Sequence, residues 1–100
     1  MAKKIIIIGG GVAGLSAGIY GALEGYDCTI LERHSCLGGN LTGWNRDGYH
    51  IDNCIHWLTG TAEGTELRQV WETLGALTPN TEMCKTGRFY GSVYDGQSIS

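Results

Sequence analysis

Residues 3–14 read Lys-Lys-Ile-Ile-Ile-Ile-Gly-Gly-Gly-Val-Ala-Gly, and this stretch decides the fold. Its apolar run, Ile5 to Ile8, is β-branched, which is typical of a central parallel strand that is covered on both faces. Apolar residues then recur at helical spacing, at Val12, Leu15, Ile19 and Leu23. Residues 27–32, Asp-Cys-Thr-Ile-Leu-Glu, are typical of a second strand. Residues 3–32 are therefore predicted to form one βαβ unit of an α/β, Rossmann-like domain with a parallel sheet.

The glycines between the first strand and the helix fit the pattern G-x-G-x-x-G, with its glycines at Gly9, Gly11 and Gly14. Because the pattern follows a strand and opens a helix, it is specific for dinucleotide binding. Gly9 permits the tight turn, Gly11 lets a pyrophosphate approach the backbone, and Gly14 lets the helix pack close to the strand. The helix N-terminus offers N–H groups and partial positive charge to the phosphates. No Gly-Lys-Ser/Thr follows, so a P-loop is excluded.

Glycine makes up 17 of the 100 residues, well above the average share of about 7%, so the backbone geometry must require it. Gly18 and Gly21 lie inside the expected helix, where each costs about 1 kcal/mol relative to alanine. With Gly14 and Ala17 they form a smooth stripe along the helix. We expect an unusually close contact between the helix and the sheet along this stripe.

Glu32 closes the second expected strand, where an acidic side chain can accept hydrogen bonds from the ribose hydroxyls of adenosine. Its negative charge would repel a 2′-phosphate, so NADP is disfavoured at this site even though Arg33 is adjacent. The alternative is a strand-end glutamate that faces solvent and binds nothing.

The rest of the chain divides into shorter segments. Residues 33–60 are expected to hold a Gly-Gly loop and a hairpin that turns at Asp47-Gly48, a strong two-residue turn signal. Residues 64–75 are expected to hold a short amphipathic helix that ends at a glycine. Residues 88–100 resemble the start of a further hairpin, with its turn at Asp95-Gly96. We expect the sequence to be the N-terminal portion of a longer protein, with the substrate domain absent; the alternative is a naturally short domain.

Charge and composition exclude several classes of protein. The formal net charge is −3, too weakly acidic to indicate a nucleic-acid-binding surface. No apolar run approaches the roughly 18 residues of a membrane span. The four cysteines include no C-x-x-C pair, which argues against a zinc site, and no metal is expected. A cytoplasmic protein with reduced thiols is the expectation.

Residues 32–41, Glu-Arg-His-Ser-Cys-Leu-Gly-Gly-Asn-Leu, resemble the second glycine motif of the superfamily of FAD-dependent amine oxidases and phytoene desaturases. Residues 47–60 and the helix after them are similar to phytoene dehydrogenases and retinol saturases. The resemblance implies FAD as the cofactor and places the Gly-Gly pair near its phosphates, where bare backbone amides can bind an anion. Asn40 stands where many members of the superfamily carry arginine. The expected cofactor-binding residues are Gly9, Gly11, Ala13, Gly14, Glu32, Arg33, Gly38, Gly39, Asn40 and His56.

The resemblance also implies an activity. Members of the desaturase and saturase branch transfer hydride between flavin and a carbon–carbon bond of a carotenoid or retinoid, so the expected partner is an apolar small molecule. A flavin-dependent amine oxidase and a non-catalytic nucleotide-binding fragment stay open as alternatives. No catalytic residue is assigned, and His34 and His50 are expected to be ordinary surface or strand residues. The 100 residues alone are expected to be inactive; any peripheral membrane contact would come from regions outside them, and the oligomeric state is unknown.

Overall fold

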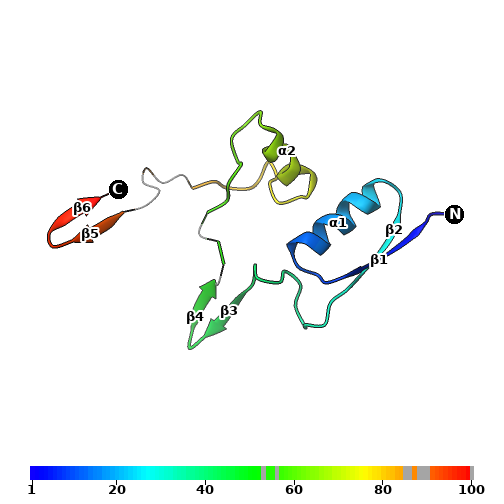
Figure 1. Cartoon of the computed structure of the whole chain (residues 1–100), viewed down its shortest axis with the longest axis horizontal. Helices are drawn as coiled ribbons and strands as arrows, with labels where there is room; N and C mark the ends of the chain where they lie inside the picture. The colour runs from blue at the N-terminus through cyan, green and yellow to red at the C-terminus, as the bar shows by residue number, and fades with distance from the viewer. Residues whose placement is uncertain (53, 56, 85–86, 88–90, 100) are drawn as a thin grey trace.

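The structure is a computed structural model of the whole chain, and it describes residues 1–52, 54–55, 57–84, 87 and 91–99. The elements follow one another as three separate regions (Figure 1): a βαβ unit, a hairpin with a short helix beyond it, and a second hairpin. Within these residues the structure has three sheets of two strands each. No helix within the described ranges is long and apolar enough to cross a membrane.

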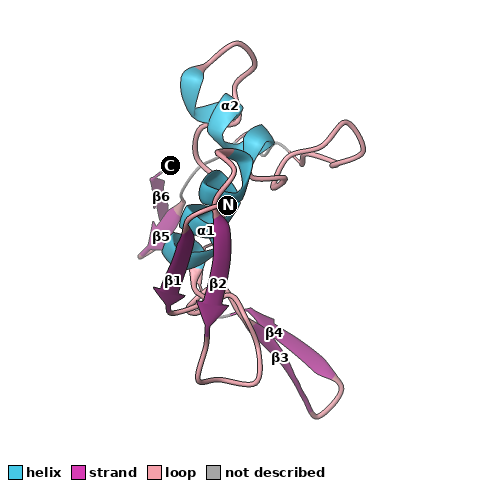
Figure 2. Cartoon of the chain, turned by 90° about the vertical axis from the view of Figure 1, so that its right-hand side faces the viewer, coloured by secondary structure: helices cyan, strands magenta, loops and turns pink. Residues whose placement is uncertain are grey.

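The βαβ unit consists of β1 (Lys4–Ile8), α1 (Val12–Leu23) and β2 (Asp27–Leu31). The strands are parallel, with register from Lys4 opposite Asp27 to Ile8 opposite Leu31. Figure 2 shows β1 and β2 side by side in front, with α1 behind them, so the helix covers one face of the pair. The predicted Rossmann-like fold with a parallel sheet is confirmed.

Glycines bring α1 unusually close to the two strands. A Cβ atom at Gly18 would lie 2.8 Å from Ile30 Cδ1, and one at Gly21 would lie 2.7 Å from Cys28 Sγ. Real Cβ atoms essentially never come this close to a neighbour, so any other residue at either site would require the Ile30 or the Cys28 side chain to shift. Ala17, which was expected in the same stripe, is exposed instead.

The opposite face of the two strands is bare. Side chains alternate along each strand, so Ile5 and Ile7 are half-buried against α1 whereas Ile6 and Ile8 are 67% and 80% exposed. On β2, Leu31 is 51% exposed. The expectation of a central strand covered on both faces is therefore wrong for the described residues. In the described residues, α1 covers one face of β1 and β2 pairs with one of its edges.

Two hairpins turn where the sequence predicted. Strands β3 (Gly43–Arg46) and β4 (Tyr49–Asp52) are antiparallel and join through Asp47 and Gly48, whose φ angles are 50° and 82°. Positive φ at both central residues matches the twist of the flanking strands. Strands β5 (Ser92–Tyr94) and β6 (Gln97–Ile99) repeat this turn at Asp95-Gly96. Part of the expected 88–100 segment lies outside the described residues.

Helix α2 (Glu66–Thr73) is shorter than the expected 64–75 because Thr65 caps its start and Leu74 its end. The Thr65 side chain accepts a hydrogen bond from the Arg68 backbone N–H, so the first turn begins one residue later. The preceding loop packs on the helix through two hydrogen bonds: Trp71 Nε1–H donates to the Thr59 carbonyl at 2.9 Å, and an Arg68 guanidinium N–H donates to the Thr61 carbonyl at 2.5 Å.

The described chain is extended rather than compact. Its radius of gyration is 18.2 Å, compared with about 13 Å for a compact domain of this length. Among the described residues, Leu77 is the one large apolar residue that is buried, with 4% of its surface exposed. Stability in the βαβ unit therefore depends on the narrow contact between α1 and the inner face of the strands.

Replacing Gly18 with leucine should abolish cooperative folding, because the side chain would have to occupy the space of Ile30. Ala17→Leu is the matched control, since it adds the same side chain one position away on the exposed side of α1. Urea denaturation followed by circular dichroism measures both. Equal stability of the two variants would contradict the close contact.

Candidate dinucleotide-binding site

The turn from β1 into α1 is bare backbone. Gly9 has φ of 108°, a conformation that suits glycine, and its N–H donates to the Leu31 carbonyl at 2.8 Å. A Cβ atom at Gly14 would overlap the Gly9 carbonyl oxygen, so the turn closes only around glycine. Gly11 is the N-cap of α1, and no side chain caps the helix. The first amides of α1 are therefore left for a ligand, at the positive end of the helix dipole.

The Gly-Gly loop lies directly against this turn. The Gly38 N–H donates to the Gly10 carbonyl at 2.8 Å, and Gly38 forms an isolated parallel bridge with Gly11. A Cβ atom at Gly39 would lie 3.1 Å from Gly11 Cα. Gly38 and Gly39 have φ of 116° and 59°, which L side chains rarely adopt. The two glycine motifs, separated along the sequence, thus form one continuous backbone surface.

An open cavity of about 380 Å³ lies over this surface. Most of its lining is the glycine turn and the first turn of α1, joined by residues of the Gly-Gly loop. The lining residues are Ile8, Gly9, Gly11, Val12, Ala13, Gly14, Gly38, Asn40 and Leu41. Backbone amides, small residues and a helix N-terminus around an open space are the features that bind a diphosphate.

Glu32 lies beside the turn and holds it. One carboxylate oxygen accepts from the Gly10 N–H at 2.8 Å and the other from the His34 N–H at 2.9 Å. These two backbone hydrogen bonds, first that of Gly10, lower the pKa of the carboxyl below its usual 4.5, so the side chain is held ionised. A carboxylate has about four acceptor positions, so two remain for ribose hydroxyls. The expected ribose contact is compatible with this geometry and stays a prediction.

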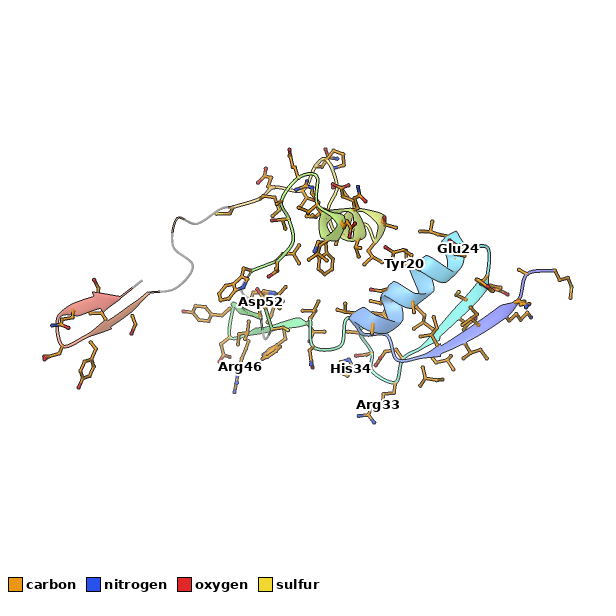
Figure 3. All side chains as sticks on the ribbon, turned by 45° about the horizontal axis from the view of Figure 1, so that its top comes forward. Tyr20, Glu24, Arg33, His34, Arg46 and Asp52 are labelled. Carbon is orange, nitrogen blue, oxygen red and sulfur yellow. The ribbon has the colours of Figure 1, made fainter. Side chains whose placement is uncertain are left out.

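The other expected site residues fall into three groups. Ala13 and Asn40 line the cavity beside the glycines. Arg33 is exposed, and in Figure 3 its side chain extends away from the rest of the chain. His56 lies outside the described residues. Arg33 is therefore not brought to the cavity in this structure.

Two residues of the site were not singled out from the sequence. Gly10 donates to Glu32 and accepts from Gly38, and a Cβ there would lie 2.6 Å from Leu37 Cδ2. The signal was an additional glycine between Gly9 and Gly11, at a position that the motif leaves free. Leu41 lines the cavity as an apolar residue after the Gly-Gly pair, and nothing in its identity or spacing marked it.

A parallel βαβ unit with a glycine turn, an uncapped helix and an acid at the end of β2 defines a dinucleotide-binding domain. The chain belongs to the family of NAD(P)-binding Rossmann-like domains, whose family model matches residues 7–74.

Three curated relatives show where this domain occurs. The chain is 33% identical over 70 residues to cinnamate reductase of Clostridium sporogenes, covering 66% of this chain and 10% of the relative. It is 44% identical over 43 residues to carotenoid phi-ring synthase of Chlorobaculum tepidum, covering 43% of this chain and 7% of the relative. It is 40% identical over 52 residues to 4,4'-diaponeurosporene oxygenase of Staphylococcus aureus, covering 52% and 10%. The matched part thus spans a tenth or less of each relative.

The lowered pKa of Glu32 predicts a pH-dependent stability. A carboxyl whose folded pKa is depressed contributes stability above its unfolded pKa and loses it as pH falls through the folded value. The difference in unfolding free energy between wild type and Glu32→Gln should therefore be at its maximum at pH 7. It should decrease as the pH falls below about 4.5. Denaturation at several pH values measures it, with Glu82→Gln, in an exposed loop, as the control. A difference that persists unchanged in acid would contradict the ionised hydrogen-bonded carboxylate.

Proposed function

We propose that this chain binds the adenosine diphosphate half of FAD, as part of an oxidoreductase that acts on carbon–carbon bonds of a polyisoprenoid. The observation that carries the proposal is the apposition of the two glycine motifs, Gly9 to Gly14 and Gly38-Gly39, around one cavity. The family supports a dinucleotide cofactor. The choice of FAD rests on the Gly-Gly motif, which resembles that of FAD-dependent amine oxidases and phytoene desaturases.

In the proposed complex, each group of residues has a separate task. The amides at the start of α1 and in the Gly-Gly loop bind the two phosphates, and Glu32 accepts hydrogen bonds from the adenosine ribose. Bound FAD would supply the hydride chemistry, as flavins do. The residues described here bind and orient the cofactor, and none of them is assigned a proton-transfer step.

The substrate class is supported by the relatives. The names of two relatives refer to a carotenoid and to 4,4'-diaponeurosporene, which favours a long apolar polyene as the substrate. We propose a cytoplasmic location as well, supported by the absence of a disulfide among Cys28, Cys36, Cys54 and Cys84, which are free in the structure.

A second candidate function is reduction of a small unsaturated acid. It is favoured by the similarity to cinnamate reductase, which extends over 66% of this chain. Both candidates place a dinucleotide on the same glycine surface, so they differ in substrate alone. Incubating the purified protein with a reduced cofactor and either cinnamate or an acyclic carotenoid, and analysing the products, separates them.

The absorbance spectrum of the purified protein tests the cofactor directly. A flavin spectrum, or saturable binding of FAD in preference to NAD and NADP in a fluorescence titration, is the expected result. Preference for NAD would show that the Gly-Gly motif does not select the flavin nucleotide and would overturn the proposal.

Gly11→Ala should separate binding from folding. A Cβ atom at Gly11 would meet only Gly39 Cα, at 3.7 Å, so the fold accommodates it while the methyl group narrows the phosphate surface. We expect FAD affinity to fall at least about tenfold, the effect of losing one or two charge-assisted hydrogen bonds. The melting temperature of the unliganded protein should stay unchanged. Gly14→Ala is the contrasting variant, because its methyl group would overlap the Gly9 carbonyl and destabilise the turn itself.

A further inference from the structure

The hairpin of β3 and β4 has one face with aromatic side chains, which also carries Arg46, and one polar face. Trp44 pairs with Ile51 and Arg46 with Tyr49 on one side, whereas Asn45 pairs with His50 and Gly43 with Asp52 on the other. Figure 3 shows Arg46 and Asp52 extending from opposite sides of the hairpin. The polar face is thus separate from the aromatic one and is available to bind a polar group.

Three side chains on the polar face form a chain of hydrogen bonds. His50 Nδ1 lies 3.1 Å from Asn45 Oδ1, and His50 Nε2 lies 3.0 Å from Asp52 Oδ1. An ionised carboxylate only accepts, so Nε2 carries the hydrogen and donates to Asp52. The Asn45 amide can face Nδ1 with either its oxygen or its nitrogen, so the arrangement holds whether or not Nδ1 is protonated.

Gly43 makes room for this arrangement. It lies directly opposite Asp52 in the ladder, and a Cβ atom there would lie 2.6 Å from His50 Nε2 and 2.7 Å from Asp52 Oδ1. Any other residue at this position would have to push the imidazole or the carboxylate aside. The hydrogen bond between His50 and Asp52 on β4 therefore depends on the presence of a glycine at position 43 of β3.

Asp52 also lines a second cavity, of about 270 Å³. Its lining is mostly apolar, and the lining residues are Leu41, Thr42, Gly43, Asp52, Cys54 and Ile55. Leu41 lines this cavity and the phosphate cavity alike, so the two adjoin. A mostly apolar space with one carboxylate in its lining suits a planar heterocycle that carries an N–H donor.

We propose that Asp52 accepts a hydrogen bond from a ring N–H of the dinucleotide's second half, and that His50 and Asn45 are positioning residues that hold the carboxylate for it. This inference rests on the proposed function, because it takes FAD to be the dinucleotide. The isoalloxazine ring carries such an N–H between two carbonyl groups. His50 donates one hydrogen bond to Asp52, which leaves about three of the four acceptor positions of the carboxylate for the ligand.

Comparing FAD with ADP tests the proposal, because ADP carries the phosphates and the adenosine but no second ring. In the purified full-length protein, Asp52→Ala should weaken FAD binding by about tenfold or more, the effect of losing a charged hydrogen bond. Its affinity for ADP should be unchanged. His50→Ala should weaken FAD binding in the same direction, and His50→Gln, which keeps a donor for Asp52, should restore it. Glu82→Ala, in an exposed loop, is the control for loss of a carboxylate.

Gly43→Ala gives a second test that removes no polar group. The added methyl group should separate His50 from Asp52 and lower FAD affinity while leaving ADP affinity unchanged. Gly87→Ala is its control, because a Cβ atom there meets nothing within 4 Å. The melting temperature of each variant shows whether the hairpin is still folded.

The possible outcomes separate this inference from the proposed function. If wild type binds FAD and Asp52→Ala binds it equally well, the role of Asp52 is overturned and the cofactor assignment stands. If Asp52→Ala loses ADP and FAD equally, its role is in folding and the inference is overturned. If wild type binds ADP but not FAD, the proposed cofactor is wrong and the inference fails with it.

Discussion

The close approach of glycine backbone to neighbouring segments, with no Cβ atom at the point of contact, is the constraint on which the rest of this structure depends. Gly14 lies against the Gly9 carbonyl, Gly18 against Ile30, and Gly39 against Gly11. The first two contacts bring α1 onto the strands, and the third brings the distant Gly-Gly loop onto the turn. Together they create a surface of amides that a side chain at any of these positions would cover or displace.

The parts of the fold that the sequence predicted are those whose cause is local. The isoleucine run, the glycine turn and the two Asp-Gly turns each act over a few residues, and the structure has a strand or a turn at each. The covering of β1 depends on elements distant in the chain, and here the expectation of two covered faces was wrong: Ile6 and Ile8 are exposed. A run of apolar residues indicates which residues tolerate burial, but it does not indicate which elements pack on each face of the strand.

The same distinction applies to the site. The motif spacing predicted that the glycines and Glu32 would meet, because one βαβ unit fixes their geometry. It did not predict that Gly10 would join Glu32 to Gly38, since the motif leaves that position free. His50 was expected to be an ordinary strand or surface residue. Its contacts with Asn45 and Asp52 come from strand pairing and from the space at Gly43, and neither follows from the identity of a histidine.

The hydrogen bonds of Glu32 have a consequence for how tightly a ligand could be held. Both carboxylate oxygens accept hydrogen bonds from the amides of Gly10 and His34, so contacts within the chain fix the acid and the turn relative to each other. A nucleotide that arrives at this surface loses its own freedom of motion but does not have to immobilise the receptor as well. Preorganisation of this kind reduces the entropic cost of association and so strengthens binding without any additional contact.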